Sequence, residues 1–150
     1  MCGIAGFLYR EQNQDSGQMQ RDLVRMNELI RHRGPDGDGF WLGGKNRIGL
    51  AHKRLSIIET TEAGKQPMHT SDGHLSITYN GEIYNYIELR NELSTEFVFR
   101  TKSDTEVILA AFRKWGKDCV LKLRGMFAFV IWDELNQTLF AARDRFGIKP

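Results

Sequence analysis

The chain has 150 residues, of which 41% are hydrophobic and 27% charged, and this composition is typical of one soluble domain with its own core. A formal net charge of +2 gives no reason to expect nucleic acid or a membrane surface as a partner. The two cysteines form no disulfide framework, no Cys/His spacing predicts a zinc site, and no apolar run predicts a signal peptide or a membrane span, so we expect a cytoplasmic protein with reduced thiols.

The first residues place a cysteine where unusual chemistry is possible. Cys2 lies directly behind Met1 and ahead of an apolar run, Gly3 to Tyr9, which predicts a buried strand. Removal of Met1 would leave a thiol and a free α-amine on one residue. An α-amine titrates at about 7.7–8 and a free thiol at about 8.5, so the amine can take the proton of an adjacent thiol near neutral pH. The stretch therefore predicts either a nucleophile activated by its own terminal amine or a cysteine without a chemical role.

A helix and a glycine-rich segment follow. Apolar residues recur at spacings of four, three and four and predict one face of a helix: Met19, Leu23, Met26 and Ile30. The helix should end near His32, because segment 33–39 combines proline with several glycines. This segment lacks the spacing and the final glutamate of a calcium loop, so we expect a tight functional loop.

Two short β-like runs come next, Arg47–Ala51 and Arg54–Ile58, separated by His52 and Lys53. Arg54 opens the second run, where an arginine is usually a solvated edge residue. The alternative is a two-pronged clamp for a carboxylate, for which the rigid guanidinium group is suited.

The segment from His74 to Tyr79 alternates as a strand does, and Asn80-Gly81 follows it. One interpretation is a β-hairpin with an Asn-Gly turn. The other is an oxyanion hole, in which a side-chain amide and an adjacent glycine N–H donate from the end of a strand.

Two further helices are predicted. One covers Tyr86 to about Leu93, and the other begins at Ser103 as N-cap, with Glu106 completing a capping box, and stops near Gly116. Asp104 lies in the first turn, where the helix dipole favours a carboxylate whatever its function.

The last third of the chain predicts paired strands. Met126 to Trp132 is typical of a strand that is covered on both faces, residues 133–137 of a turn, and Thr138 to Ala142 of its partner strand.

Motifs along the whole chain resemble those of the N-terminal glutaminase domain of glutamine-hydrolysing asparagine synthetase, a class II glutamine amidotransferase of the N-terminal-nucleophile hydrolase type. They are Met1–Phe7, Arg31–Gly37, Arg54–Ile57, Asn80–Asn85, Ser103–Glu106, Leu123–Phe129 and Ala142–Pro150. Relatives that feed ammonia to sugar phosphates or to phosphoribosyl pyrophosphate usually carry Arg-Trp at the arginine clamp. The Arg-Leu-Ser-Ile sequence found here favours the asparagine synthetase branch.

The resemblance implies an α+β fold, a four-layer αββα sandwich of two mainly antiparallel sheets with helices outside. The family's glutaminase domain continues with more strands, so residues 1–150 are expected to be an incomplete glutamine amidotransferase domain, truncated at its C-terminus. The implied partners are L-glutamine, a C-terminal synthetase domain and further copies in a homo-oligomer, with neither nucleic acid nor membrane. No cofactor or metal is expected in this domain, because ATP and magnesium would act in the synthetase domain that amidates aspartate.

The resemblance also implies catalytic roles. Cys2 would attack the side-chain amide of glutamine, and its α-amine would pass the proton to the departing ammonia. The Asn80 side chain and the Gly81 N–H would hold the oxyanion. Two alternatives stay open: a non-catalytic binding or assembly module on the same fold, and the glutaminase domain of an amidotransferase with another acceptor.

The binding roles are implied in the same way. Arg54 would bind the α-carboxylate of glutamine, while Glu82 and Asp104 would bind its α-ammonium. Segment 33–39 would be a mobile loop near the pocket. Backbone groups would line the pocket at Leu55, Ser56, Ile57 and Ile58.

Overall fold

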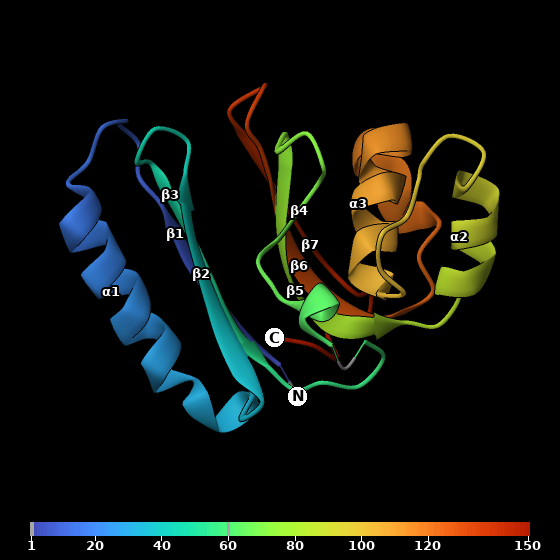
Figure 1. Cartoon of the computed structure of the whole chain (residues 1–150), viewed down its shortest axis with the longest axis horizontal. Coiled ribbons are helices and arrows are strands. Elements are labelled where there is room, and N and C mark those ends of the chain that lie inside the picture. Colours follow the sequence, from blue (N-terminus) through green and yellow to red (C-terminus); the bar gives the residue numbers. More distant parts are fainter. Residues whose placement is uncertain (1, 60) are drawn as a thin grey trace.

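In the computed structural model, which describes residues 2–59 and 61–150, two β-sheets face each other and helices cover their outer faces (Figure 1). The first sheet has the strand order β1-β3-β2 and the second the order β4-β5-β6-β7. Helix α1 covers the first sheet, and helices α2 and α3 cover the second. The layers therefore run helix, sheet, sheet, helix, and the expected αββα sandwich is confirmed.

The first sheet is antiparallel throughout, with β3 in its centre. Its strands are β1 (Gly3–Leu8), β2 (Gly37–Gly43) and β3 (Ile48–Arg54). Helix α1 (Ser16–Leu29) begins where the Asp15 side chain accepts the N–H groups of Gly17 and Gln18, and it turns Met19, Leu23 and Asn27 toward the sheet. The predicted helix is thus confirmed, although it ends before Ile30. The buried residue of its last turns is Asn27 rather than the predicted Met26.

Two predictions about this sheet are wrong. Arg47–Ala51 and Arg54–Ile58 are not separate strands, because His52 and Lys53 pair with β1 on one side and β2 on the other. Residues 55–58 lie outside any strand. Segment 33–39 is not wholly a loop either, since its residues 37–39 pair with β3. Only glycine fits at position 39, where a Cβ atom would lie 2.0 Å from the Gln66 carbonyl oxygen.

The second sheet is also antiparallel. Its strands are β4 (Met68–His69), β5 (Leu75–Ile83), β6 (Gly125–Asp133) and β7 (Thr138–Arg143). Strand β5 runs through Asn80-Gly81 without a break, and these two residues pair with Ala128 and Phe127 of β6. The hairpin-turn interpretation of Asn80-Gly81 is therefore wrong, because a long partner strand holds both residues in extended backbone.

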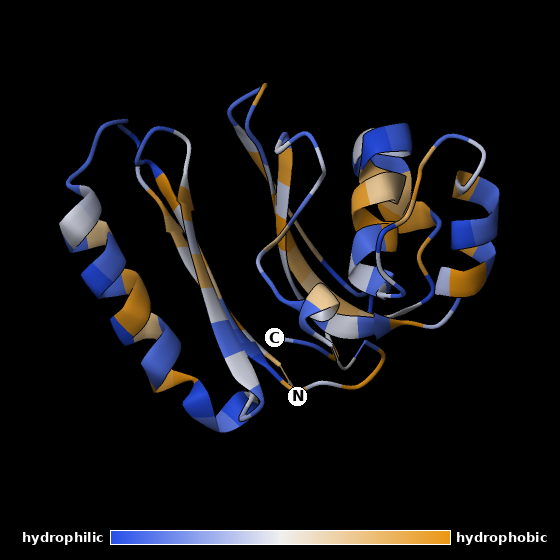
Figure 2. Ribbon diagram, in the orientation of Figure 1, coloured by the Kyte–Doolittle hydropathy of each residue, from blue (hydrophilic) through white to orange (hydrophobic). Residues whose placement is uncertain are grey.

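Most of the core lies between the second sheet and its two helices, α2 (Tyr86–Leu93) and α3 (Asp104–Trp115). The apolar faces of these helices turn toward the sheet in Figure 2. A smaller apolar cluster between the two sheets is formed by Ile48, Leu50 and Trp132. This packing holds β3 of the first sheet against β5 and β6 of the second.

The start of α3 follows the prediction in part. The Ser103 side chain accepts the N–H of Thr105 and caps the helix, as expected. Glu106, however, does not reach back to Ser103. Its carboxylate accepts the N–H groups of Arg100 and Thr101 instead, so the reciprocal half of the capping box is wrong.

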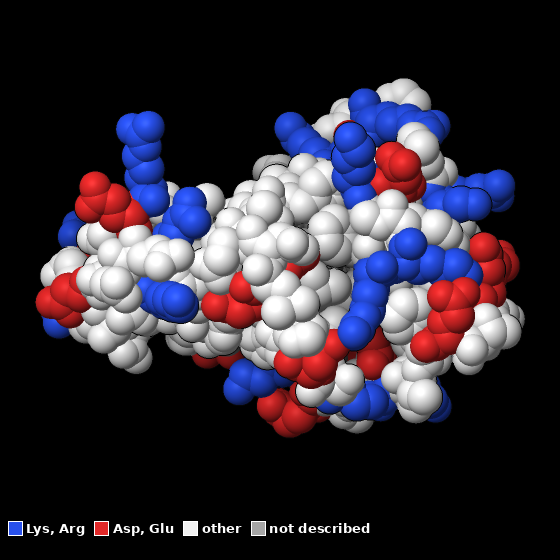
Figure 3. All heavy atoms as spheres, turned by 90° about the horizontal axis from the view of Figure 1, so that it is seen from above, with Lys and Arg blue, Asp and Glu red and all other residues white. Residues whose placement is uncertain are grey.

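Acidic and basic side chains are interspersed over the face seen in Figure 3. Within residues 2–59 and 61–150, no helix has the length and apolarity needed to cross a membrane.

Candidate active site

The Cys2 thiol lies at the start of β1 and is held by the residue that follows β3. Register pairs Gly3 with Lys53 and so brings Cys2 beside the end of β3. Its Sγ accepts the Leu55 N–H at 3.3 Å and lies 3.5 Å from the Leu55 carbonyl oxygen. The Cys2 carbonyl oxygen accepts Nε of Arg33 at 3.1 Å. Cys2 is half-buried, and hydrogen bonds hold both its thiol and its carbonyl oxygen. Met1, on whose removal the predicted activity depends, lies outside the described residues.

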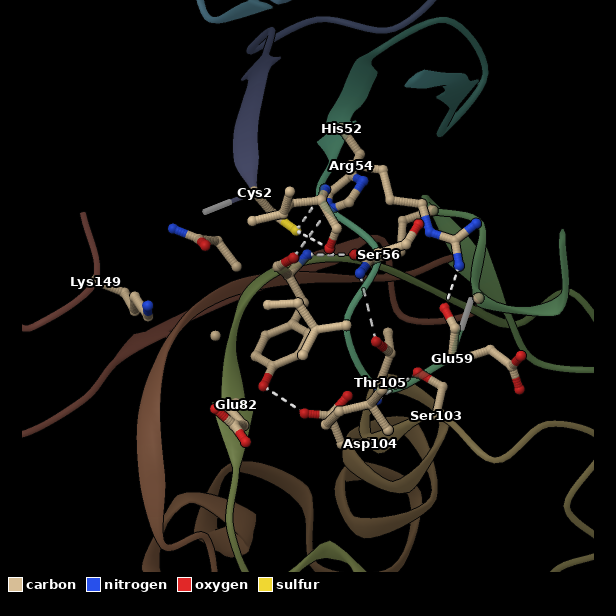
Figure 4. A pocket seen from close by; sticks show the side chains of 18 of the residues that line it. Cys2, His52, Arg54, Ser56, Glu59, Glu82, Ser103, Asp104, Thr105 and Lys149 are labelled. Carbon is tan, nitrogen blue, oxygen red and sulfur yellow. Dashed lines mark hydrogen bonds between the residues drawn. The ribbon is translucent and has the colours of Figure 1, made fainter. Parts of the chain in front are cut away.

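A single cavity brings together every residue that the sequence assigned to the site (Figure 4). The residues come from distant parts of the chain: the start of β1, the end of β3 and the loop behind it, β5, and the first turn of α3. The predicted residues that line it are Cys2, Arg54, Leu55, Ser56, Ile57, Ile58, Asn80, Gly81, Glu82 and Asp104.

Arg54 is buried rather than a solvated edge residue, with 9% of its surface exposed. Its guanidinium donates to the Glu59 carbonyl oxygen, which fixes its orientation beside the cavity (Figure 4). A Cβ atom at position 64 would lie 2.6 Å from the guanidinium and 2.9 Å from the Glu59 carbonyl oxygen, so a larger residue there would displace one of them. The Glu59 carboxylate in turn accepts from Thr61 and from the Lys102 N–H, which ties this loop to the segment before α3.

One edge of β5 directs its backbone groups away from β6 and toward residues that line the cavity. Tyr79 directs both of its backbone groups away from β6: its N–H donates to Oε1 of Gln66 at 2.7 Å, and its carbonyl lies 3.1 Å from Nε2 of His52. The Ile83 N–H also leaves this edge, toward Asp104. Since alternate residues of an antiparallel strand face the same edge, Gly81 directs its N–H there too.

The Asn80 side chain and the Gly81 N–H thus border one cavity together with the Cys2 sulfur. Glycine is required at position 81, where a Cβ atom would lie 2.3 Å from the Met126 carbonyl oxygen. A thiol beside an amide side chain and a backbone N–H is the arrangement that stabilises an oxyanion formed at an attacked carbonyl.

Asp104 is a buried carboxylate at the N-terminus of α3. Its Oδ2 accepts the Tyr79 hydroxyl at 2.7 Å and the Ile83 N–H at 3.0 Å. Burial raises the pKa of Asp104, and these hydrogen bonds oppose the rise. Glu82 lines the same cavity, and Figure 4 shows both carboxylates apart from the Arg54 guanidinium. The Arg54 guanidinium and these two carboxylates therefore lie in different parts of the cavity.

Several lining residues were not assigned to the site from the sequence. They are His52, Glu59, Gly64, Gln66, Tyr79, Ser103, Thr105, Met126 and Lys149. His52 could have been found, because it lies two residues before Arg54 on the same face of one strand. Gln66 is brought to the cavity by folding alone, and no local pattern marks it. Lys149 lies in the motif Ala142–Pro150, to which the resemblance gave no role in the site.

His52 is one of the perturbed groups in this cavity. Burial lowers its pKa to about 4, so the imidazole is neutral at pH 7. No group of three or more His, Cys, Asp or Glu side chains in the described part of the chain is arranged to hold a metal ion. The cavity thus offers a thiol, hydrogen-bond donors and separated charges.

Comparison with known proteins agrees with this geometry. A family model of the glutamine amidotransferase domain matches residues 1–150. Asparagine synthetase (glutamine-hydrolysing) 1 of Bacillus subtilis is 45% identical over 151 residues, which cover 100% of this chain and 23% of that protein. The amidase chry2 of Gibberella zeae is 42% identical over 156 residues, which cover 99% of this chain and 23% of that protein.

A solved structure, glutamine phosphoribosylpyrophosphate amidotransferase from B. subtilis complexed with ADP and GMP, superimposes with a TM-score of 0.74 at 21% identity. The match covers 98% of this chain and 38% of the other, and it supports the fold. The chain spans about a quarter of the length of the curated relatives that it matches.

Proposed function

Because the chain belongs to the family of glutamine amidotransferase domains, we propose that it hydrolyses L-glutamine to glutamate and ammonia with Cys2 as the nucleophile. The observation that carries this proposal is the single cavity that gathers Cys2, the Asn80 and Gly81 donors, Arg54 and Asp104. Each of these groups matches one part of the substrate or of the reaction.

Substrate recognition follows from the charges. Free glutamine presents one carboxylate and one ammonium group at a fixed separation. Arg54, oriented by the Glu59 carbonyl, would bind the carboxylate, and Asp104 with Glu82 would bind the ammonium. Backbone groups of Leu55 to Ile58 would line the space between them. A ligand that lacks either charge would leave a buried group unpaired and bind poorly.

The reaction would proceed through a thioester. The Cys2 sulfur attacks the side-chain carbonyl carbon, and the carbonyl oxygen becomes an oxyanion that the Asn80 amide and the Gly81 N–H bind. The C–N bond then breaks, and the α-amine of Cys2 gives the proton it took from the thiol to the leaving ammonia. Water attacks the thioester, releases glutamate and restores the thiol.

We further propose that the ammonia serves the amidation of aspartate by a C-terminal synthetase domain, where ATP and magnesium would bind. Support comes from the glutamine-hydrolysing asparagine synthetases among the relatives, whose length this chain covers only in part. The amidase chry2 keeps another acceptor possible. A nucleophilic thiol must stay reduced, so we propose that the whole protein is cytoplasmic. The family resemblance leads us to propose that it is also a homo-oligomer.

Ammonia release from glutamine tests the proposal. The chain beginning at Cys2 should release ammonia, a Cys2→Ala variant should bind glutamine without turnover, and a chain with an uncleavable residue before Cys2 should be inactive because its nitrogen is an amide. If the chain beginning at Cys2 bound glutamine without hydrolysing it, the domain would be a binding module. Equal turnover by the extended chain would remove the amine as the base.

A further inference from the structure

The two halves of the site lie on different sheets. Cys2 precedes β1 in the first sheet, whereas Asn80 and Gly81 belong to β5 in the second (Figure 1). An oxyanion hole works only when its donors lie at hydrogen-bond distance from the oxygen that forms at the attacked carbon. Any sliding of one sheet over the other would change that distance.

Two hydrogen bonds join β3 to β5 among the described residues. Oγ1 of Thr78 donates to the Ala51 carbonyl oxygen at 3.1 Å, and Nε2 of His52 lies 3.1 Å from the Tyr79 carbonyl oxygen. The second contact is closer to the reaction, because the Tyr79 carbonyl belongs to the peptide group that also contains the Asn80 nitrogen.

The backbone of Tyr79 is held by side chains because, within residues 2–59 and 61–150, no strand pairs with it on this edge. Strand β4 begins at Met68, which pairs with Ile77 of β5, so it stops short of Tyr79. Oε1 of Gln66 accepts the Tyr79 N–H at 2.7 Å, and His52 supplies the partner for the carbonyl. His52 thus replaces a strand at the point where the oxyanion donors begin.

The protonation state of His52 suits this task. A carbonyl can only accept, so Nε2 must carry the proton. The imidazole is neutral at pH 7, because burial lowers its pKa to about 4, and its second nitrogen then carries none. Nδ1 is buried and has no partner among the described residues. The ring could donate its single proton to the reaction only by releasing the Tyr79 carbonyl.

We propose that His52 is a positioning residue, which sets the Asn80 and Gly81 donors at their working distance from the Cys2 sulfur by bonding β3 to the Tyr79 carbonyl. The proposal rests on the proposed glutamine hydrolysis. It assigns His52 no contact with the reacting atoms and no part in proton transfer.

Three substitutions in the chain that begins at Cys2 separate this role from others. His52→Gln keeps a donor near the place of Nε2 and should retain kcat within about threefold. His52→Asn places its amide near Nδ1 instead, and His52→Leu has no donor. Both should lower kcat by about 10- to 100-fold, the loss expected for a misplacement of about 1 Å. KM should stay within about twofold in all three, because Arg54 and Asp104 bind the substrate.

Thr78→Val is the matched control, since it removes the other bond between β3 and β5 without touching the Tyr79 carbonyl. It should lower the melting temperature as His52→Leu does, with kcat kept. Wild-type kcat in both His52→Asn and His52→Leu would overturn the proposal. An inactive but folded His52→Gln would also overturn it, because it would mean that the imidazole transfers a proton.

A spectroscopic measurement keeps the alignment testable apart from activity. Nitrogen-15 spectra of labelled His52 should show a neutral ring protonated at Nε2 from pH 6 to 8. Amide shifts of Asn80 and Gly81 should move in His52→Leu and return in His52→Gln. If the wild-type chain released no ammonia, the proposed function would fail, but these spectra would still test whether His52 positions Asn80 and Gly81. A His52 ring protonated at Nδ1 would overturn that positioning role.

Discussion

The Tyr79 hydroxyl donates a 2.7 Å hydrogen bond to Oδ2 of Asp104. This contact joins the middle of β5 to the first residue of α3, and both side chains are buried. It aims the carboxylate at the cavity and helps to keep it ionised against the effect of burial.

Tyr79→Phe should therefore weaken glutamine binding in a pH-dependent way. Without the hydroxyl, the pKa of Asp104 should rise further above its ordinary value, so the carboxylate takes up a proton at a higher pH as the solution is acidified. KM should increase as pH falls, starting from a higher pH than in the wild type, while kcat changes little. Steady-state kinetics between pH 5 and 8 would measure this. A KM profile that overlays the wild-type profile would show that the hydroxyl does not influence the carboxylate.

Arg54→Lys should raise KM for glutamine by about tenfold or more. A lysine keeps the charge but cannot donate to the Glu59 carbonyl and to both oxygens of a carboxylate with one fixed plane. The melting temperature should change little, because the cationic group is conserved. Arg113→Lys is the control, since Arg113 pairs with Asp72 at the surface. An unchanged KM would remove Arg54 from the substrate site.

Asn80→Ala should lower kcat by about 10²-fold or more and leave KM nearly unchanged, as for the loss of one oxyanion donor. Stability should change little, since Asn80 lines the cavity and belongs to neither apolar cluster. Asn91→Ala, at an exposed position of α2, serves as the control. A folded Asn80→Ala variant with the wild-type rate would assign the oxyanion to other donors.

The chain should lose stability in mild acid through His52. Its pKa is about 4 in the folded chain, against an ordinary value of 6.5 that applies to the unfolded chain. The stabilisation is therefore present above pH 6.5 and is lost as pH falls toward 4, because the unfolded state takes up the proton first; the full effect is about 3 kcal/mol. Burial lowers the pKa of His69 in the same direction.

Urea denaturation at pH 7 and pH 4.5, performed on the wild type and on His52→Gln, isolates the part due to His52. The wild type should lose more free energy of unfolding than the variant between the two pH values. Equal losses in the two proteins would place the acid sensitivity elsewhere.

Local patterns in the sequence were sufficient for the elements whose stabilising interactions are close in sequence. The spacing of Met19 and Leu23 marks the buried face of α1, and Ser103 caps α3 through the N–H of Thr105. Hydrophobic periodicity and capping act over a few residues, so they can be read without knowing the partners. The ordered motifs likewise indicated the family, and they named residues that folding brings to one cavity.

Tertiary structure decided the strands whose pairing partners lie far along the chain. Asn80-Gly81 has the composition of a turn, yet β6, more than forty residues away, holds it in a strand. His52 and Lys53 separate two apolar runs in the sequence, yet β1 and β2 make them part of one strand. Pairing across the sheet outweighs local preference here, because each strand residue gains its partners from other segments.

The cavity itself is a property of the tertiary structure. The motifs named Cys2, Arg54, Asn80 and Asp104, but nothing in the sequence measures the separation between two sheets. Only the folded chain places His52 of one sheet against the Tyr79 carbonyl of the other and so joins the strand next to Cys2 to the strand that carries Asn80 and Gly81. Such a distance depends on packing between segments that share no local pattern, which is why it could be seen only in three dimensions.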